Sequence, residues 1–158
     1  MNQRGILIGI CCLLVLTAAD LSAQRVYTPN SVLATGTWYK IGLKQAGIYK
    51  IDLNFLAALG INTGNLASAS IRLYGNGGGM LAENNAAPRI DDLFENAIDM
   101  VDGGDGLFNG SDYFQFYAPG PDQWLKDSVN KRFRHSRNLY ADTAYYYCLL
   151  YTSPSPRD

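Results

Sequence analysis

The densest group of candidate metal ligands in this sequence lies in the glycine-rich stretch between residues 102 and 112. Four side chains there carry oxygen ligands: Asp102, Asp105, Asn109 and Asp112. Calcium prefers several oxygen ligands, so these four residues are the candidate ligands of a calcium loop. The EF-hand motif itself fails, because aligning Gly106 with its sixth position places Val101 at the first. The composition resembles that of a calcium loop, but the default interpretation is a hairpin loop stabilised by Asx turns.

Two other features could carry chemistry, and a structural role explains both better. Gly75–Gly79 follows a predicted strand, but it lacks the lysine and hydroxyl residue of a phosphate-binding loop, and no convincing helix follows. A tight turn with positive φ explains these glycines. His135 is the single histidine, and its neighbour Ser136 would point to the opposite face of a strand. Without a partner in reach, His135 is interpreted as a structural or surface residue.

Seven aromatic residues could form a platform on which sugar rings stack. They are Trp38, Tyr39, Tyr74, Tyr113, Phe116, Tyr117 and Trp124. In β domains such side chains more often form the core and its rim. An exported carbohydrate-binding or adhesin-like β domain is therefore kept as an alternative function.

The elements that must position these residues are mostly strands. Short alternating or β-branched segments, separated by clusters of Gly, Asn, Asp and Pro, predict strands at Ser31–Leu43, Ile48–Ile51, Ile71–Tyr74, Asn96–Val101, Tyr113–Ala118, Arg132–Tyr140 and Ala144–Tyr147. The first two are predicted to form a hairpin, and the last two another pair. Asp52 is a predicted cap for a short helix over Leu53–Leu59, with Gly60 as its stop. The predicted fold is mainly β: an antiparallel β-sandwich or barrel-like domain with one short helix.

The composition and charge exclude several classes of protein. With 47% hydrophobic and 12% aromatic residues, the chain is too apolar to be disordered. A formal net charge of −1 argues against the basic footprint of a nucleic-acid-binding protein, so no nucleic-acid partner is expected. Charge is nevertheless segregated: Glu83–Asp122 holds nine acids and one base, and Lys126–Arg137 holds five bases and one acid. These stretches either solvate loops, face each other in the fold, or form a docking surface with two signs of charge.

Both ends of the 158-residue sequence differ from its centre. Residues 1–23 have the pattern of a signal peptide, because Arg4 precedes the apolar run Gly5–Ala19 and small residues follow it. A spanning helix needs roughly 20 apolar residues, so export is expected, with no transmembrane helix after signal cleavage. Residues 148–158 can be encoded by DNA that resembles the transposon end and adapter of tagmentation sequencing libraries. We interpret that tail as a sequencing artefact.

The expected domain is therefore residues 24–147. All three cysteines lie in the two ends, at Cys11, Cys12 and Cys148. The central segment then offers no disulfide, no thiolate metal site and no cysteine nucleophile, and one histidine cannot form a histidine cluster. Apart from the candidate calcium loop, no cofactor is expected.

Several motifs occur in the same order as in a known family. They are Gly36–Ile41, Gly47–Ile51, Ile71–Met80, Asp91–Ile98, Gly110–Tyr117, Gly120–Trp124 and His135–Tyr147. As an ordered set they resemble the N-terminal region of the type IX secretion system sortases, the PorU type of gingipain-like cysteine peptidase found in Bacteroidetes. The resemblance covers nearly all of residues 24–147.

The resemblance implies a larger, outer-membrane-associated parent protein. Members of the family place an N-terminal β region before a gingipain-like catalytic domain, cleave C-terminal sorting domains from secreted cargo and can attach that cargo to lipopolysaccharide. No catalytic position of the family matches a residue here, so the fragment itself is expected to lack activity. The implied partners are other type IX secretion components and cargo proteins. The implied location is the periplasm, the outer membrane or the cell surface.

Overall fold

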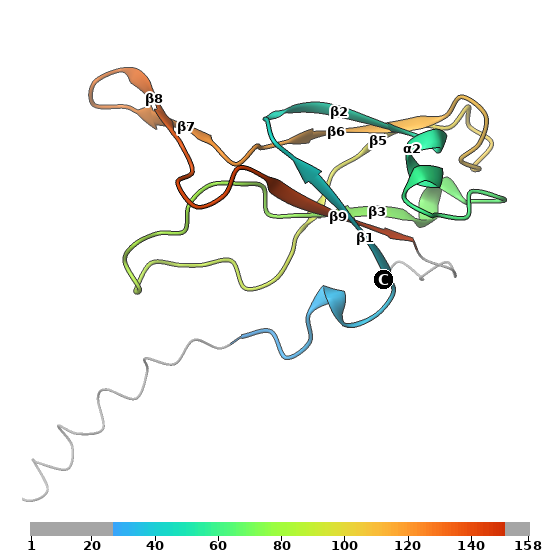
Figure 1. Ribbon diagram of the computed structural model, residues 1–158, viewed down its shortest axis with the longest axis horizontal. Coiled ribbons are helices and arrows are strands. Elements are labelled where there is room, and N and C mark those ends of the chain that lie inside the picture. Colours follow the sequence, from blue (N-terminus) through green and yellow to red (C-terminus); the bar gives the residue numbers. More distant parts are fainter. Residues whose placement is uncertain (1–26, 151–158) are drawn as a thin grey trace, which may run out of the picture.

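Strands dominate the structure, a computed structural model that describes residues 27–150 (Figure 1). The strands are β1 (Thr37–Leu43), β2 (Gly47–Asp52), β3 (Ile71–Tyr74), β4 (Glu95–Asn96), β5 (Asp99–Val101), β6 (Tyr113–Ala118), β7 (Gln123–Asp127), β8 (Arg132–Ser136) and β9 (Ala144–Leu150). The described helices are α2 (Leu53–Ala58) and the 3₁₀ turns η2 (Val32–Ala34) and η3 (Ser68–Ser70). No helix within residues 27–150 has the length and hydropathy needed to cross a membrane.

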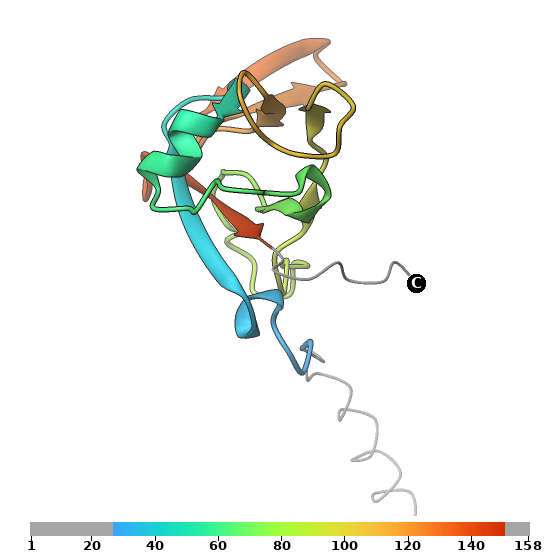
Figure 2. The same ribbon diagram turned by 90° about the vertical axis from the view of Figure 1, so that its right-hand side faces the viewer.

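The described strands pair antiparallel in three sheets. Their orders are β1-β9-β3-β4, β2-β6-β5 and β7-β8. In Figure 1, α2 lies at one end of the first two sheets, and the β7–β8 hairpin projects from the other. Figure 2, viewed from the α2 side, shows β9 crossing opposite the strands of the second sheet. Neither of these two sheets closes on itself, which confirms the predicted mainly β, sandwich-like fold with one short α-helix in the described part.

The core lies between the first two sheets because alternate residues of their strands point inward. Ile71 and Leu73 of β3 are buried, and so are Phe114 and Phe116 of β6. The rings of Phe116 and Tyr146 lie 5.4 Å apart and join the two sheets. Tyr146 is fully buried, and its hydroxyl donates to the carbonyl oxygen of Pro119 at 3.0 Å. This bond satisfies the polar end of a core aromatic residue.

The predicted hairpin between the first two strands is wrong. β1 pairs with β9 from Thr37↔Leu150 to Leu43↔Ala144, and β2 pairs with β6 from Gly47↔Ala118 to Asp52↔Tyr113. The short connection between β1 and β2 is therefore a corner that leads from one sheet to the other. Both strands are correctly predicted as extended, but the alternation of residues does not encode which strand is the partner. The longer first strand also begins only at Thr37, since Ser31 caps η2 instead.

Two further strand assignments need correction. The predicted strand Asn96–Val101 is divided, because β4 pairs with β3 while β5 pairs with β6 in the other sheet. The predicted pairing of the last two strands is also wrong: β8 pairs with β7, and β9 lies between β1 and β3. The polar strand β7 was not predicted. β9 reaches Leu150 and so includes the first three residues of the adapter-like tail.

The helix prediction is confirmed, and so is the positive φ predicted for the glycine-rich segment. The Asp52 side chain accepts from Phe55 N at 2.9 Å and caps α2, and Gly60 follows the helix with φ +85. In the glycine-rich segment, Gly77 has φ +72. A Cβ on Gly78 would lie 2.0 Å from the Gly120 carbonyl oxygen. Residues 75–80 do not form a hydrogen-bonded turn, so that part of the prediction is wrong: glycine is needed here for positive φ and for close contact between two backbones.

The segment before β1 is fastened by a pair of acidic residues. Asp92 accepts from Val32 N at 2.7 Å and from the Ser31 hydroxyl at 2.9 Å, and Thr28 N donates to Asp91. The backbone donors Val32 and Leu93 hold the pKa of the Asp92 carboxyl below its ordinary value. These two acids of the acidic stretch therefore act as structural hydrogen-bond acceptors.

The variant Tyr146→Phe should lose about 1 kcal/mol of unfolding free energy, because the Pro119 carbonyl loses its donor. Burial raises the pKa of Tyr146 from 10.0 to about 12. The neutral phenol is favoured in the folded state, so stability should be full below pH 10 and fall as pH rises toward 12. Urea unfolding over this pH range should show a smaller fall in Tyr146→Phe. Burial also raises the pKa of Cys148 to about 12, so a thiol contribution remains in both proteins.

The control is Tyr140→Phe, since Tyr140 is 89% exposed. Its stability and alkaline profile should match those of the parent. An unchanged alkaline profile in Tyr146→Phe would contradict the proposed contribution of the buried phenol.

Candidate binding surfaces

The predicted calcium loop connects β5 to β6, and its acidic side chains bind groups within the loop. Asp102 accepts from Gly104 N at 3.1 Å, and Asp105 accepts from Leu107 N at 2.9 Å. Asp112 accepts from Asn109 N at 2.8 Å, and the Asn109 amide donates to Asp105 at 3.3 Å. The contacts of Asp102 and Asp105 are the Asx turns of the default interpretation, and those of Asp112 and Asn109 are further contacts within the loop. Across residues 27–150, no group of three or more His, Cys, Asp and Glu side chains is arranged to hold a metal ion.

The same loop is attached to the core through η3. Ser68 N donates to Gly106 O at 3.0 Å, Phe108 N donates to Leu66 O at 2.7 Å, and the Phe108 side chain is buried. The Ser68 hydroxyl is the main cause of a lowered pKa at Asp102, although it makes no hydrogen bond of ordinary geometry with the described residues. The four predicted ligands therefore have a structural role as loop-stabilising groups. The calcium site stays a prediction.

The seven aromatic residues do not form one platform. Phe116 is buried in the core, while its sequence neighbour Tyr117 is 63% exposed on the opposite face of β6. Trp38 and Tyr74 meet edge to face on the other sheet, with ring centroids 5.2 Å apart. Trp124 lies on the β7–β8 hairpin. Because successive residues of a strand point to opposite faces, aromatic composition did not predict a shared surface.

The outer face of the first sheet carries aromatic and charged side chains that contact each other. The Lys40 ammonium lies 3.6 Å from the centroid of the Tyr145 ring. Arg72 pairs with Glu95 at 3.5 Å. Lys40 therefore covers one face of the Tyr145 ring. Trp38 and Tyr74 each cover part of the other's ring through their edge-to-face contact. This arrangement favours a self-contained sheet surface over a sugar-stacking platform.

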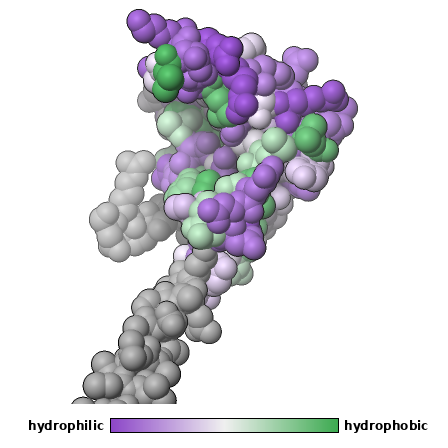
Figure 3. Space-filling model, turned by 90° about the vertical axis from the view of Figure 1, so that its left-hand side faces the viewer, coloured by the Kyte–Doolittle hydropathy of each residue, from purple (hydrophilic) through white to green (hydrophobic). Residues whose placement is uncertain are grey.

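The β7–β8 hairpin is the surface that the sequence patterns did not predict. Trp124 lies opposite His135 with ring centroids 4.9 Å apart, and Lys126 lies opposite Phe133. Trp124 is 70% exposed and Phe133 is 68% exposed. Figure 3, viewed from the hairpin side, shows a largely hydrophilic surface with separated hydrophobic groups. The missed signal was the turn-forming stretch Ser128–Lys131 between two short extended segments.

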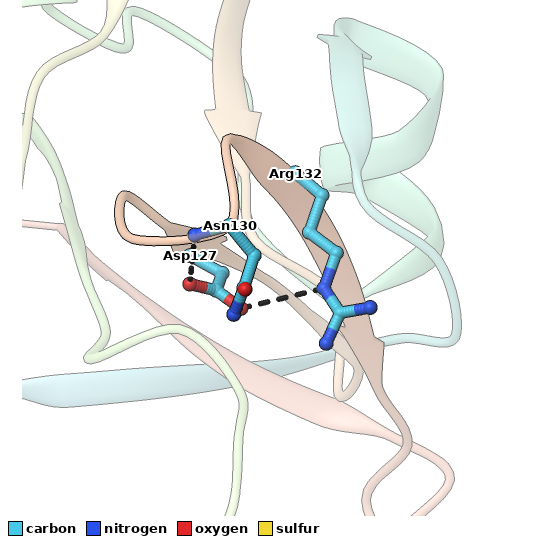
Figure 4. Close-up of polar contacts among 3 residues, drawn as sticks. All are labelled: Asp127, Asn130 and Arg132. Atoms are coloured by element: carbon cyan, nitrogen blue, oxygen red, sulfur yellow. Dashed lines mark hydrogen bonds and ion pairs between the residues drawn. The ribbon is translucent and has the colours of Figure 1, made fainter.

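A compact set of hydrogen bonds stabilises the turn of this hairpin (Figure 4). Asp127 accepts from the Asn130 backbone at 3.0 Å and from the Asn130 amide at 2.7 Å. It also pairs with Arg132 Nε at 3.3 Å. The Asn130 amide is the largest cause that lowers the pKa of Asp127. Asp127, the one acid of the basic stretch, is thus occupied by the turn itself.

His135 holds the base of the hairpin. Its Nε2 lies 3.5 Å from Asp122 Oδ2, and the other oxygen of Asp122 accepts from Asn138 N at 2.8 Å. The interpretation of His135 as a structural or surface residue fits this position. Cys148 is buried in β9, where burial raises its pKa to about 12, the opposite of an activated thiolate. Cys148 is the single cysteine within residues 27–150, and no hydrogen bond there joins it to His135.

These features define a mainly β, sandwich-like domain with an attached hairpin and without an evident catalytic centre in the described part. A solved protein with a similar fold is that in the crystal structure of dimeric latent PorU from Porphyromonas gingivalis. The match has a TM-score of 0.54 and 26% sequence identity, and it covers 75% of this chain. The chain spans about a tenth of the PorU chain, since 10% of that chain is covered. No protein-family model and no curated protein matches this sequence.

The melting temperature of this protein should be the same in calcium as in a chelator. The loop carboxylates already accept hydrogen bonds from within the loop, and a ligand that binds only the folded state must raise the melting temperature. Thermal unfolding followed by circular dichroism measures this. A calcium-dependent rise that is absent from Asp105→Asn would contradict this expectation and support the predicted calcium loop.

The variant Asp127→Ala should loosen the hairpin while leaving the sandwich unchanged. Amide hydrogen exchange in β7 and β8 should become faster, because Asn130 and Arg132 lose their acceptor. The lowered pKa of Asp127 means that its contribution is present above the ordinary value of 3.8 and is lost as pH falls through the folded-state pKa. Glu83→Ala, which removes an exposed carboxylate elsewhere, is the matched control. Equal exchange rates in both variants would contradict the role of Asp127.

Proposed function

We propose that this chain is the non-catalytic N-terminal β domain of an exported cysteine peptidase of the type IX secretion sortase class. The observation that carries the proposal is the structural match to PorU, at 26% identity over 75% of this chain. The ordered motifs from Gly36 to Tyr147 support the same assignment. The parent protein would cleave C-terminal sorting signals from secreted cargo through a domain that lies outside this sequence.

The described residues support a non-catalytic role for this part. A cysteine peptidase needs a thiolate activated by a neighbouring base. The one cysteine among residues 27–150, Cys148, is buried and falls in the tail that we interpret as adapter-derived, and His135 pairs with Asp122 at the base of the hairpin. We therefore assign the domain to support or docking of the parent enzyme. Its proposed partners are type IX secretion components and cargo proteins.

The proposed location is the exported side of the cell, in the periplasm, at the outer membrane or on the surface. The signal-peptide pattern of residues 1–23 supports export, but those residues lie outside the described part. The match to PorU supports the same compartment for this domain.

The reading frame of the source gene should continue past codon 147 into a gingipain-like domain with a catalytic cysteine and histidine. Sequencing the genomic locus from both flanks tests this without relying on the fragment library. The codons for residues 148–158 should then differ from the adapter string. A genuine stop codon at or soon after residue 158, or a downstream domain without those two residues, would contradict the proposal.

A further inference from the structure

The β7–β8 hairpin presents two strands that no neighbouring strand completes. Within residues 27–150, β7 and β8 pair only with each other, and no other described element packs extensively against them. A two-stranded hairpin is marginally stable in water, and a third strand adds hydrogen bonds to backbone groups at its edge. The hairpin is therefore a template for an extended polypeptide.

The charge of the hairpin selects the kind of polypeptide. Four cations of the basic stretch are exposed and have no ion-pair partner among the described residues: Lys126, Lys131, Arg134 and Arg137. The acid in this stretch, Asp127, is occupied by Asn130 and Arg132. The stretch therefore carries uncompensated positive charge on both strands, in the turn between them and directly after β8. These cations would repel a basic strand, whereas an acidic strand would neutralise their charge.

The side chains add a second requirement. Trp124, Lys126, Phe133 and His135 share one face, because they are directly opposed pairs in the ladder. Trp124 and Phe133 leave most of their surface in water. An added strand would place its apolar side chains on this face, beside the rings, and its alternating acidic side chains on the opposite face, where Arg134 lies.

We propose that the β7–β8 hairpin binds an acidic, extended polypeptide segment as a third strand. The backbone groups at the hairpin edge match the N–H and C=O groups of a peptide, which neither a lipid surface nor a nucleic acid offers at strand spacing. The aromatic residues also favour a peptide, since they lie along the strands and not at the tip, where Val129 is the one apolar residue. A membrane-inserting hairpin would place its aromatic residues at that tip.

Binding can be measured by tryptophan fluorescence of the purified protein. The chain has two tryptophans, so the Trp38→Phe variant leaves Trp124 as the reporter on the hairpin. The probe is a synthetic peptide in which glutamate alternates with valine. Binding should give a saturable blue shift of Trp124 emission that weakens as salt rises. A peptide with lysine in place of glutamate should give none.

Two controls separate strand addition from simple charge attraction. The same acidic peptide with alternate backbone amides N-methylated should bind at least about tenfold more weakly, because it cannot pair along an edge. The variant Arg134→Glu should also weaken binding by about tenfold or more, whereas Lys44→Glu, a charge reversal at an exposed lysine outside the hairpin, should not. Circular dichroism of each variant verifies that the sandwich is folded.

The proposal is overturned by any of three results with folded protein. The first is no binding of the glutamate–valine peptide. The second is equal binding of its N-methylated form. The third is equal or tighter binding of phosphatidylglycerol vesicles or of a thymidine oligonucleotide, which would assign the hairpin to a lipid surface or to nucleic acid. These outcomes are independent of the gene sequence that tests the proposed function.

Discussion

The contact of Tyr146 with Phe116 is the interaction on which the rest of the fold depends. β9 is an inner strand of its sheet, with β1 on one side and β3 on the other, and Tyr146 points from it into the core. Phe116 projects toward it from β6, the middle strand of the second sheet. The contact therefore links the two strands that hold their sheets together. Aromatic pairs of this kind contribute beyond the area that they bury.

The Tyr146 side chain also determines which residue can follow β3. A Cβ on Gly75 would lie 2.6 Å from the Tyr146 ring. Only glycine, which has no Cβ, therefore fits at the position directly after β3. The Tyr146 hydroxyl then reaches Pro119 at the end of β6. Packing in the core is in this way coupled to the position of the chain that leads into β7. The sequence pattern predicted a tight turn here, but the reason for a glycine at this point is a tertiary contact.

Local signals predicted the elements better than they predicted their arrangement. The cap at Asp52 and the alternation over Tyr113–Ala118 define α2 and β6 almost to the residue. Strand pairing depends on contacts between distant segments, so the corner between β1 and β2 looked like a hairpin. β7 was missed because only Trp124 and Leu125 of its five residues are hydrophobic. A strand that does not face a core has no hydrophobic period to reveal it.

The candidate sites show the same division between local and distant information. The loop of Asp102 to Asp112 has the composition of a calcium site, yet its geometry is one of local Asx contacts. The charge segregation, by contrast, persists in the fold, since the contact between Asp122 and His135 is the one pair that joins the acidic and basic stretches within residues 27–150. Both features could be recognised from residue types alone. Only the structure shows which charged side chains already have hydrogen-bond or ion-pair partners and which are exposed without one.

The contacts at the base of the β7–β8 hairpin explain how this solvent-exposed hairpin can have a fixed direction. At its base, Gln123 donates to Gly78 O at 2.9 Å, and a Cβ on Gly120 would lie 2.5 Å from Ala46 N. The backbone segments at Ala46, Gly78 and Gly120 therefore meet where a side chain would not fit. This close packing restricts rotation of the hairpin about its base. A segment bound along the hairpin would be held at a set angle to the sandwich. The domain can then contribute orientation, because it would hold a bound polypeptide in one direction relative to the sandwich.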